Sequence, residues 1–192
     1  MPQAKHVTAL ALRAGKRQQL PADLAKYFAR CEEKLGFVPN VLKAYSFSEP
    51  RLRAFIDMYN ELMLADSRLS RLEREMIAVV VSSINRCYYC LTAHGAAVRQ
   101  MSGDPELGEL LVMNYRAAPL PRRQRAMLDF AHKLTTKPAE VDAADRRKLK
   151  RAGWNARDIW DISSVTAFFN MSNRLAIAVD MMPNAEYHAQ AR

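Results

Sequence analysis

The sequence has little of what secreted or membrane-spanning proteins require. It contains three cysteines in 192 residues, an odd number and too few for the disulfide framework of a small secreted fold. Its longest purely apolar run, Met76 to Val81, is far shorter than the roughly 20 residues that cross a bilayer. The basic N-terminal stretch has no apolar run followed by a small-residue cleavage site, so we expect no signal peptide. We therefore expect a cytoplasmic protein without a membrane partner.

Glycine is also scarce, with 6 residues, whereas the helix-favouring residues alanine, leucine, arginine, methionine and glutamate are plentiful. No segment alternates polar and apolar residues with the period of two that is typical of strands. The chain is 49% hydrophobic and long enough to bury a core of its own. We therefore predict an all-α protein that forms a single helical domain over 1–192.

Apolar residues at helical spacing, together with capping signals, predict helices along most of the chain. The clearest signal is the capping box Ser70-Arg71-Leu72-Glu73, which begins a helix whose apolar residues cover more than one face. We expect this helix to lie at the centre of the fold, and to end at a break at Asn85-Arg86. The predicted ranges are 22–35, 41–45, 50–63, 71–84, 88–101, 105–113, 121–136, 142–151 and 156–180.

A shift of 85 residues suggests an internal duplication. It aligns the helix cap Ser70 with Asn155, and Asn85 with Asn170. Under this interpretation both copies are capped apolar helices interrupted near an asparagine, and only the first copy kept its cysteines. The other interpretation is chance, because the matches are few.

Acidic residues are fewer than basic ones, 20 against 29, which gives a formal net charge of +9. The basic residues cluster in two predicted helices, as Arg122-Arg123-Arg125 and as Arg146-Arg147-Lys148-Lys150-Arg151. No nucleic-acid-binding signature accompanies them, so we expect no nucleic-acid partner. We interpret the clusters as solvated helix faces, while attraction of an anionic protein or small molecule stays open.

The chemically informative stretch covers residues 85–94, Asn-Arg-Cys-Tyr-Tyr-Cys-Leu-Thr-Ala-His. On a helix, Cys90 follows Cys87 by three residues and His94 follows Cys90 by four, so all three side chains share one stripe. A thiol at its ordinary pKa of about 8.5 is mostly protonated at neutral pH. The helix N-terminus, the adjacent Arg86 and the imidazole each favour the thiolate. Two thiols beside a histidine are what two-electron peroxide or disulfide chemistry requires.

Glu75 is the candidate proton acceptor. Glu73 has a structural role as the capping partner of Ser70, whereas Glu75 has none that the sequence reveals, and it shares a helical side with apolar residues. A partly buried carboxylate whose pKa is raised by desolvation can accept and return a proton.

Two other interpretations of the cysteine pair stay open. Closed zinc sites use four ligands, whereas Cys87, Cys90 and His94 supply three and no second pair is present. Alternatively, the cysteines are small core residues beside an incidental histidine. We favour redox chemistry without a metal or cofactor. Cys31 is predicted to be a core residue without a chemical role.

The pattern of Glu75, Cys87, Cys90 and His94 resembles the carboxymuconolactone decarboxylase-like superfamily, and within it the alkylhydroperoxidase D branch. In that branch a glutamate lies about a dozen residues before a Cys-x-x-Cys, and a histidine follows the second cysteine by four. Pro39-Asn40 further resembles the subgroup of peroxidase-related enzymes. The resemblance covers roughly 36–180, which leaves 1–35 as an N-terminal helical extension.

The resemblance implies a thiol-dependent peroxidase that acts on hydrogen peroxide or organic hydroperoxides. Cys90 would attack the peroxide, with His94 and Glu75 moving its proton. Cys87 would resolve the sulfenic acid and exchange with an external dithiol or protein reductant. Tyr89 is a departure, because the best-known members have histidine there, and a phenol is a weaker proton acceptor.

The resemblance also implies an alkylhydroperoxidase D-like helical bundle that forms homo-oligomers. Two other functions stay open: a dithiol-disulfide oxidoreductase or redox adaptor for another protein, and a non-catalytic helical oligomer module. The branch that decarboxylates ring lactones lacks the cysteine pair, so we set that activity aside.

Overall fold

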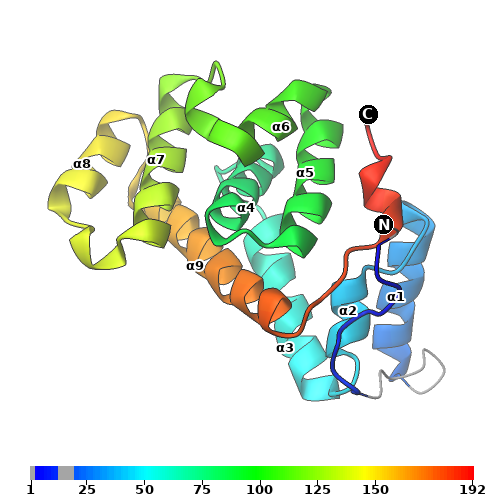
Figure 1. The fold of residues 1–192 in the computed structure, drawn as a ribbon. Coiled ribbons are helices and arrows are strands. Elements are labelled where there is room, and N and C mark those ends of the chain that lie inside the picture. Colours follow the sequence, from blue (N-terminus) through cyan, green and yellow to red (C-terminus); the bar gives the residue numbers. More distant parts are fainter. Residues whose placement is uncertain (1–2, 13–19) are drawn as a thin grey trace.

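The computed structural model describes residues 3–12 and 20–192 (Figure 1). All regular secondary structure of these residues is helical, which confirms the predicted fold class. The α-helices are α1 (Ala22–Leu35), α2 (Asn40–Tyr45), α3 (Glu49–Tyr59), α4 (Arg71–Asn85), α5 (Tyr88–Ser102), α6 (Pro105–Asn114), α7 (Arg122–Thr136), α8 (Ala143–Arg151) and α9 (Ala156–Ala178). Short helical turns of other types are η2 (Asn60–Leu64), η3 (Tyr115–Ala117), η4 (Pro138–Glu140) and η5 (Ala185–His188).

Helix α4 lies at the centre of the bundle, as predicted. Its capping box is formed: the Ser70 hydroxyl accepts the Glu73 backbone N–H at 3.1 Å, and the Glu73 carboxylate accepts the Ser70 N–H at 2.9 Å. Residues 73–82 are all buried, because α4 packs against α5, α6, α7 and α9 on its different sides (Figure 1). Residues 73–82 of α4 therefore face the interior whichever way they point.

The predicted break between α4 and α5 is confirmed at Arg86. This residue lies in the left-handed region, with φ 55° and ψ 38°, and reverses the chain direction after Asn85. The turn is held by backbone hydrogen bonds from Arg86 N–H to Ser83 O at 3.1 Å and from Cys87 N–H to Ser82 O at 3.0 Å. The turn leaves Cys87 as the residue that caps the N-terminus of α5.

Helix α9 begins at the predicted Asn155 cap and packs against α4. It runs without a break from Ala156 to Ala178, so the predicted interruption near Asn170 is wrong. The reason is topological: the chain must reverse after Asn85 to form α5, whereas nothing requires a turn after Asn170. The two aligned asparagines nevertheless meet, since Asn85 Nδ2 donates to Asn170 Oδ1 at 3.1 Å. The duplication itself stays a prediction.

The N-terminal segment differs from the helical extension that was expected. Helix α1 begins at Ala22, while residues 3–12 are irregular and lie beside the C-terminal segment. There, Ala9 N–H donates to Val179 O at 2.9 Å, and Met182 N–H donates to Val7 O at 3.0 Å. These backbone groups are paired with a distant segment instead of within a helix. The rest of the expected extension before α1 lies partly outside the described residues.

The C-terminal segment that follows α9 is fixed against α5 and the start of α2 (Figure 1). The buried guanidinium of Arg99 on α5 donates to the carbonyls of Tyr187 at 3.2 Å and Gln190 at 3.0 Å. Asn40 Nδ2 donates to Met182 O at 2.9 Å, and the Asn40 backbone N–H donates to Asn184 Oδ1 at 2.7 Å. Asn40, noted in the sequence beside Pro39, therefore anchors this segment.

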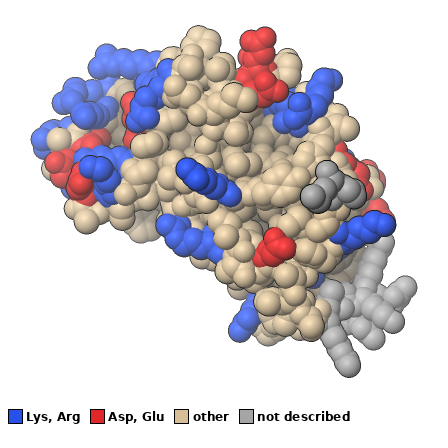
Figure 2. All heavy atoms as spheres, in the orientation of Figure 1, with Lys and Arg blue, Asp and Glu red and all other residues tan. Residues whose placement is uncertain are grey.

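The surface of the molecule is unevenly charged. Figure 2 shows lysine and arginine side chains gathered over the end of the molecule that is formed by α7 and α8. No helix in the described part of the chain combines the length and the apolar character needed to cross a membrane.

Candidate functional site

Cys87 and Cys90 lie at the first turn of α5. Both are unbridged and buried, with exposed fractions of 1% and 4%. Their thiols are hydrogen-bonded to each other. They sit in a small apolar cluster to which α5, α9, the C-terminal segment and the chain before α2 contribute; its other members are Phe37, Tyr89, Ala93, Ala96, Ala176, Met181 and Tyr187.

The two thiols have opposite pKa shifts. The hydrogen bond from Cys90 lowers the pKa of Cys87 to about 7, and the backbone N–H groups of Tyr89 and Cys90 and the charge of His94 act in the same direction, against desolvation. Backbone N–H groups at a helix N-terminus favour an anion in this way. The pKa of Cys90 is raised well above its ordinary value, because its proton is held against Cys87 and because it is buried. Cys87 is therefore the thiol of the pair that ionises first.

A buried polar network surrounds the sulfur of Cys90. Hydrogen bonds from Asn173 and Ser82 oppose the rise in its pKa. Asn173 Nδ2 donates to Ser82 Oγ at 3.0 Å, and Asn85 Nδ2 donates to Asn173 Oδ1 at 3.0 Å. Sequence reasoning missed Asn173 and Ser82. Both are polar residues at apolar-face positions of their helices. Because a buried polar group needs a hydrogen-bond partner, that pattern could have marked them as members of a polar network.

Glu75 on α4 and His94 on α5 meet at 2.6 Å, between Oε2 and Nδ1. Their side chains are 7% and 13% exposed. The carboxylate accepts the Nδ1–H, which leaves Nε2 of the imidazole free for proton transfer. The edge of Phe169 packs against the imidazole at 4.6 Å between ring centroids and fixes its orientation. The structure therefore brings together the two residues that the sequence assigned to proton handling.

His94 acts electrostatically on Cys87. Its positive charge is among the causes that lower the pKa of that thiol. Helical spacing had made His94 the partner of Cys90. Spacing counts residues along one helix, whereas Cys87 is the N-cap residue and lies outside the helical stripe that Cys90 and His94 share.

Tyr89 has a structural task at this site. Its hydroxyl accepts the backbone N–H of Val41 at 3.0 Å, which ties the start of α2 to α5. Burial raises the pKa of Tyr89 well above its ordinary value, so the phenol stays protonated at neutral pH. Both observations favour a positioning role over direct proton acceptance.

Two further phenols, Tyr59 and Tyr187, lie near Glu75 and were not found from the sequence. Burial raises the pKa of each, and the neighbouring Glu75 carboxylate raises it further. Tyr187 packs edge-on against Phe37, with 4.9 Å between ring centroids. The C-terminal segment thus contributes part of the cover over the dithiol.

Cys31 provides an internal comparison for the inert-core interpretation. It is half-buried on α1, and burial raises its pKa, as expected for a thiol without a chemical role. Cys87 is more deeply buried, yet its pKa is lowered. Across the described residues, no group of three or more His, Cys, Asp and Glu side chains is arranged to hold a metal ion.

These shifts predict a thiolate transition near neutral pH. In the Cys31→Ser protein, ultraviolet thiolate absorbance should rise with a midpoint near pH 7, as Cys87 ionises. Below this midpoint Cys87 is protonated, and above it the thiolate dominates. The Cys87→Ser, Cys31→Ser double variant is the control and should lose this transition. A midpoint near the ordinary thiol value of about 8.5 would contradict the assignment.

Comparisons with known proteins identify the family of this chain. The model of the carboxymuconolactone decarboxylase family matches residues 50–113, which include Glu75, both cysteines of the pair and His94. A crystal structure of an uncharacterised peroxidase-related protein from Silicibacter sp. TM1040 is 64% identical, with a TM-score of 0.95 and 100% of both chains covered. A peroxidase-related protein from Ralstonia eutropha JMP134, described as an alkylhydroperoxidase AhpD core, is 39% identical, with a TM-score of 0.93 and 98% of each chain covered.

A more distant similarity, in fold alone, is to a protein with a different activity. The debrominase Bmp8, solved with 2,3,4-tribromopyrrole, has the same fold at 21% identity, with a TM-score of 0.80 over 94% of this chain and 95% of that one. A comparison with curated proteins found no match. On the evidence of its fold and its two more similar relatives, the chain belongs to the carboxymuconolactone decarboxylase-like superfamily, in its alkylhydroperoxidase D-like, peroxidase-related branch.

Proposed function

We propose that this chain is a thiol-dependent peroxidase that reduces hydrogen peroxide or an organic hydroperoxide with the electrons of Cys87 and Cys90. One observation carries the proposal: two buried thiols with opposite pKa shifts lie together at the first turn of α5, beside the Glu75–His94 pair. Membership of the peroxidase-related branch supports an antioxidant role in general terms.

Cys90 attacks the peroxide in the proposed mechanism. Its proton first moves along the thiol–thiol hydrogen bond to Cys87, which is the nearest base. The Cys90 thiolate, stabilised by Asn173 and Ser82, then attacks one peroxide oxygen and the O–O bond breaks. The departing oxygen takes a proton from the His94–Glu75 pair, so the products are a sulfenic acid on Cys90 and an alcohol or water.

The second half of the cycle consumes the sulfenic acid. The Cys87 sulfur attacks the Cys90 sulfur, the hydroxyl leaves with the Cys87 proton as water, and a disulfide forms. The two thiols are oxidised by two electrons and the peroxide is reduced by two. An external dithiol, small or carried by a protein, restores the pair by thiol–disulfide exchange. We propose no metal and no cofactor for this cycle.

The low pKa of Cys87 specifically favours a second candidate, a dithiol-disulfide oxidoreductase. In that function Cys87 would attack an external disulfide directly, because its thiolate is present at neutral pH. Turnover separates the two candidates. The peroxidase consumes hydroperoxide with a dithiol reductant, whereas the oxidoreductase reduces protein disulfides at a rate that hydroperoxide does not affect.

One equivalent of hydroperoxide is expected to convert Cys87 and Cys90 into an intramolecular disulfide, while Cys31 stays reduced. The pair is three residues apart and in contact, whereas Cys31 is on another helix with a raised pKa. Peptide mapping by mass spectrometry reports the pairing. Finding Cys31 in the bridge, or no bridge at all, would contradict the proposed cycle.

The homo-oligomeric state implied by the resemblance remains a proposal. Large apolar side chains stay exposed on α9, including Trp160 at 71% and Ile177 at 50%. Exposed apolar patches frequently mark protein interfaces, which supports assembly through this helix.

A further inference from the structure

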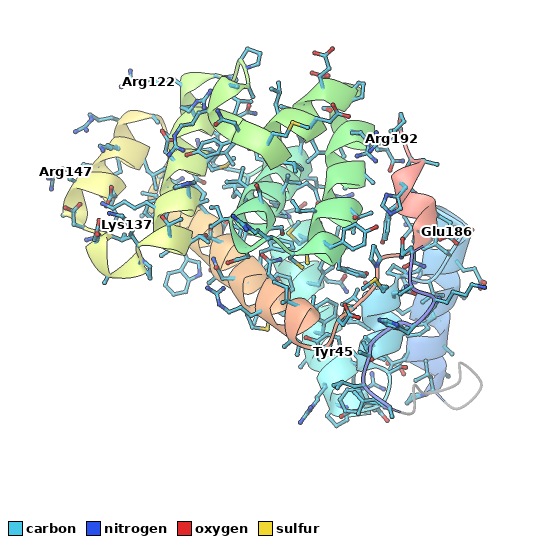
Figure 3. All side chains as sticks on the ribbon, in the orientation of Figure 1. Tyr45, Arg122, Lys137, Arg147, Glu186 and Arg192 are labelled. Carbon is cyan, nitrogen blue, oxygen red and sulfur yellow. The ribbon has the colours of Figure 1, made fainter. Side chains whose placement is uncertain are left out.

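The two basic runs of the sequence meet across a cleft between α7 and α8. The cleft has a volume of about 630 Å³, and seven lysine or arginine side chains line it against two aspartates. Arg122 and Arg125 come from the first run, and Lys148 and Arg151 from the second. Figure 2 shows this basic end of the molecule, and Figure 3 places Arg122 and Lys137 at opposite ends of α7. Folding therefore gathers cationic groups that the sequence presents separately.

The two aspartates in the cleft already have partners. Asp145 accepts Lys133 Nζ at 2.6 Å and also accepts the backbone N–H that caps α8. Asp129 accepts the hydroxyl of Tyr115 at 2.7 Å and lies 4.0 Å from the Arg116 guanidinium, while Lys137 pairs with Glu140 at 3.1 Å. Within the described residues, no carboxylate pairs with Arg122, Lys148 or Arg151. The cleft thus keeps an excess of unneutralised positive charge.

The first turn of α7 has an unfavourable charge pattern that an anion would relieve. Arg122, Arg123 and Arg125 all lie there, and this turn contains no acidic residue. Cations near a helix N-terminus are repelled by the helix dipole, which favours anions at that end. Arg123 is neutralised by Glu73 at 2.9 Å, but Arg122 is not. An anion near Arg122 would interact favourably with both the guanidinium and the helix end.

The lining of the cleft also has an apolar part. Ala126, Phe130 and Ala152 contribute to it, and Phe130 is mostly buried in the core, with 7% of its surface exposed. The volume is within the range of about 300–1,000 Å³ that is typical of small-molecule sites. A purely ionic ligand would leave the apolar part uncovered, whereas an anion with an apolar body would contact both.

We propose that this cleft binds a small organic anion, with a phosphate or carboxylate group attached to an apolar or aromatic body. The anionic group contacts Arg122, Lys148 and Arg151, and the body contacts Ala126, Ala152 and the small exposed part of Phe130. None of the residues that line the cleft belongs to the cluster around the cysteines. The proposal therefore stands independently of the peroxidase function.

Three probes test the ligand class by calorimetric titration of the full-length protein. The probes are 1-naphthyl phosphate, inorganic phosphate and neutral 1-naphthol. We expect saturable binding of naphthyl phosphate that is about tenfold or more tighter than that of either other probe, because only it has both parts. If inorganic phosphate binds as tightly as naphthyl phosphate, the apolar body contributes nothing to binding. If naphthol binds as tightly, the anionic group contributes nothing. Either result would overturn the proposal.

Charge reversal on α8 localises the binding. The Lys148→Glu, Arg151→Glu double variant changes two side chains in the cleft, whereas the Arg146→Glu, Arg147→Glu double variant changes two that do not line it. Figure 3 shows Arg147 on the side of α8 away from α7. All four are exposed, so the pairs match in helix, charge change and burial. Circular dichroism checks that both variants stay folded.

We expect the cleft variant to bind naphthyl phosphate about tenfold or more weakly, and the control variant to change its affinity by less than about twofold. An equal loss of affinity in both variants would show that the ligand responds only to the overall positive charge of the protein and not to this cleft. Binding of an acidic peptide or a single-stranded oligonucleotide without saturable binding of naphthyl phosphate would assign the surface to a macromolecule. Either outcome would refute the small-anion site.

Discussion

Replacing Cys90 with serine is expected to lower the rate of peroxide consumption by a factor of about 10³ or more, because the attacking sulfur is removed. In contrast, the Cys87→Ser protein should still react once. Serine at that position can accept the hydrogen bond but is a poor base, so the single reaction should be slower than in the unchanged protein. The product should be a sulfenic acid on Cys90 that dimedone labels and mass spectrometry locates.

The two serine variants control each other, since each keeps one thiol in the same apolar cluster. Strong dimedone labelling of Cys87 in the Cys90→Ser protein, with none at Cys90 in the Cys87→Ser protein, would reverse the roles. Cys87 would then attack directly with the thiolate that it holds at rest. This test matters because the order of attack rests on the family resemblance and on the Asn173–Ser82 network, while the resting charge lies on the other sulfur.

Replacing Glu75 with glutamine is expected to slow peroxide reduction by about 10²-fold. A positioned proton-transfer group contributes typically about 10²–10⁴-fold, and the structural role of Tyr89 leaves the relay without a further acceptor. Glutamine keeps the shape of the side chain but has no charge to stabilise the imidazolium of His94. Because the charge of His94 lowers the pKa of Cys87, the thiolate transition should also move to higher pH.

Glu73→Gln is the matched control for this experiment. Glu73 lies on the same helix and is equally buried, but it caps α4 and pairs with Arg123 at 2.9 Å instead of His94. Its replacement should lower the free energy of unfolding by about 1 kcal/mol without slowing the reaction. Stopped-flow kinetics and denaturant unfolding of both variants separate the two effects. If Glu75→Gln leaves the rate intact and lowers the Cys87 pKa, the carboxylate is a bystander.

The sequence predicted the features that depend on near neighbours along the chain. The capping box at Ser70, the helix cap at Asn155, the break at Asn85-Arg86 and the central position of α4 all follow from local spacing. The end of α3 was not predicted, since the chain leaves α-geometry at Tyr59 and continues as the π-helix Asn60–Leu64. Apolar periodicity of 3.6 continues across such a boundary and does not reveal it.

The site was predictable in its members but not in its surroundings. Spacing brings Cys87, Cys90 and His94 onto one helix, and Glu75 onto the helix before it. The groups that set the charge on each sulfur depend on tertiary folding, because Asn173 approaches from α9 and Ser82 from α4. The location of the resting thiolate depends further on which thiol donates to the other, and spacing cannot decide this.

The C-terminal segment that covers the dithiol is synthesised well after the two cysteines. Tyr187 follows Cys87 by 100 residues along the chain, the difference of their numbers. At a translation rate of about 5–20 residues per second, this separation corresponds to roughly 5–20 s on the ribosome. Throughout that interval Cys87 and Cys90 have emerged without Met181 and Tyr187 above them. A nascent chain therefore presents both thiols before it possesses the apolar cluster that encloses them.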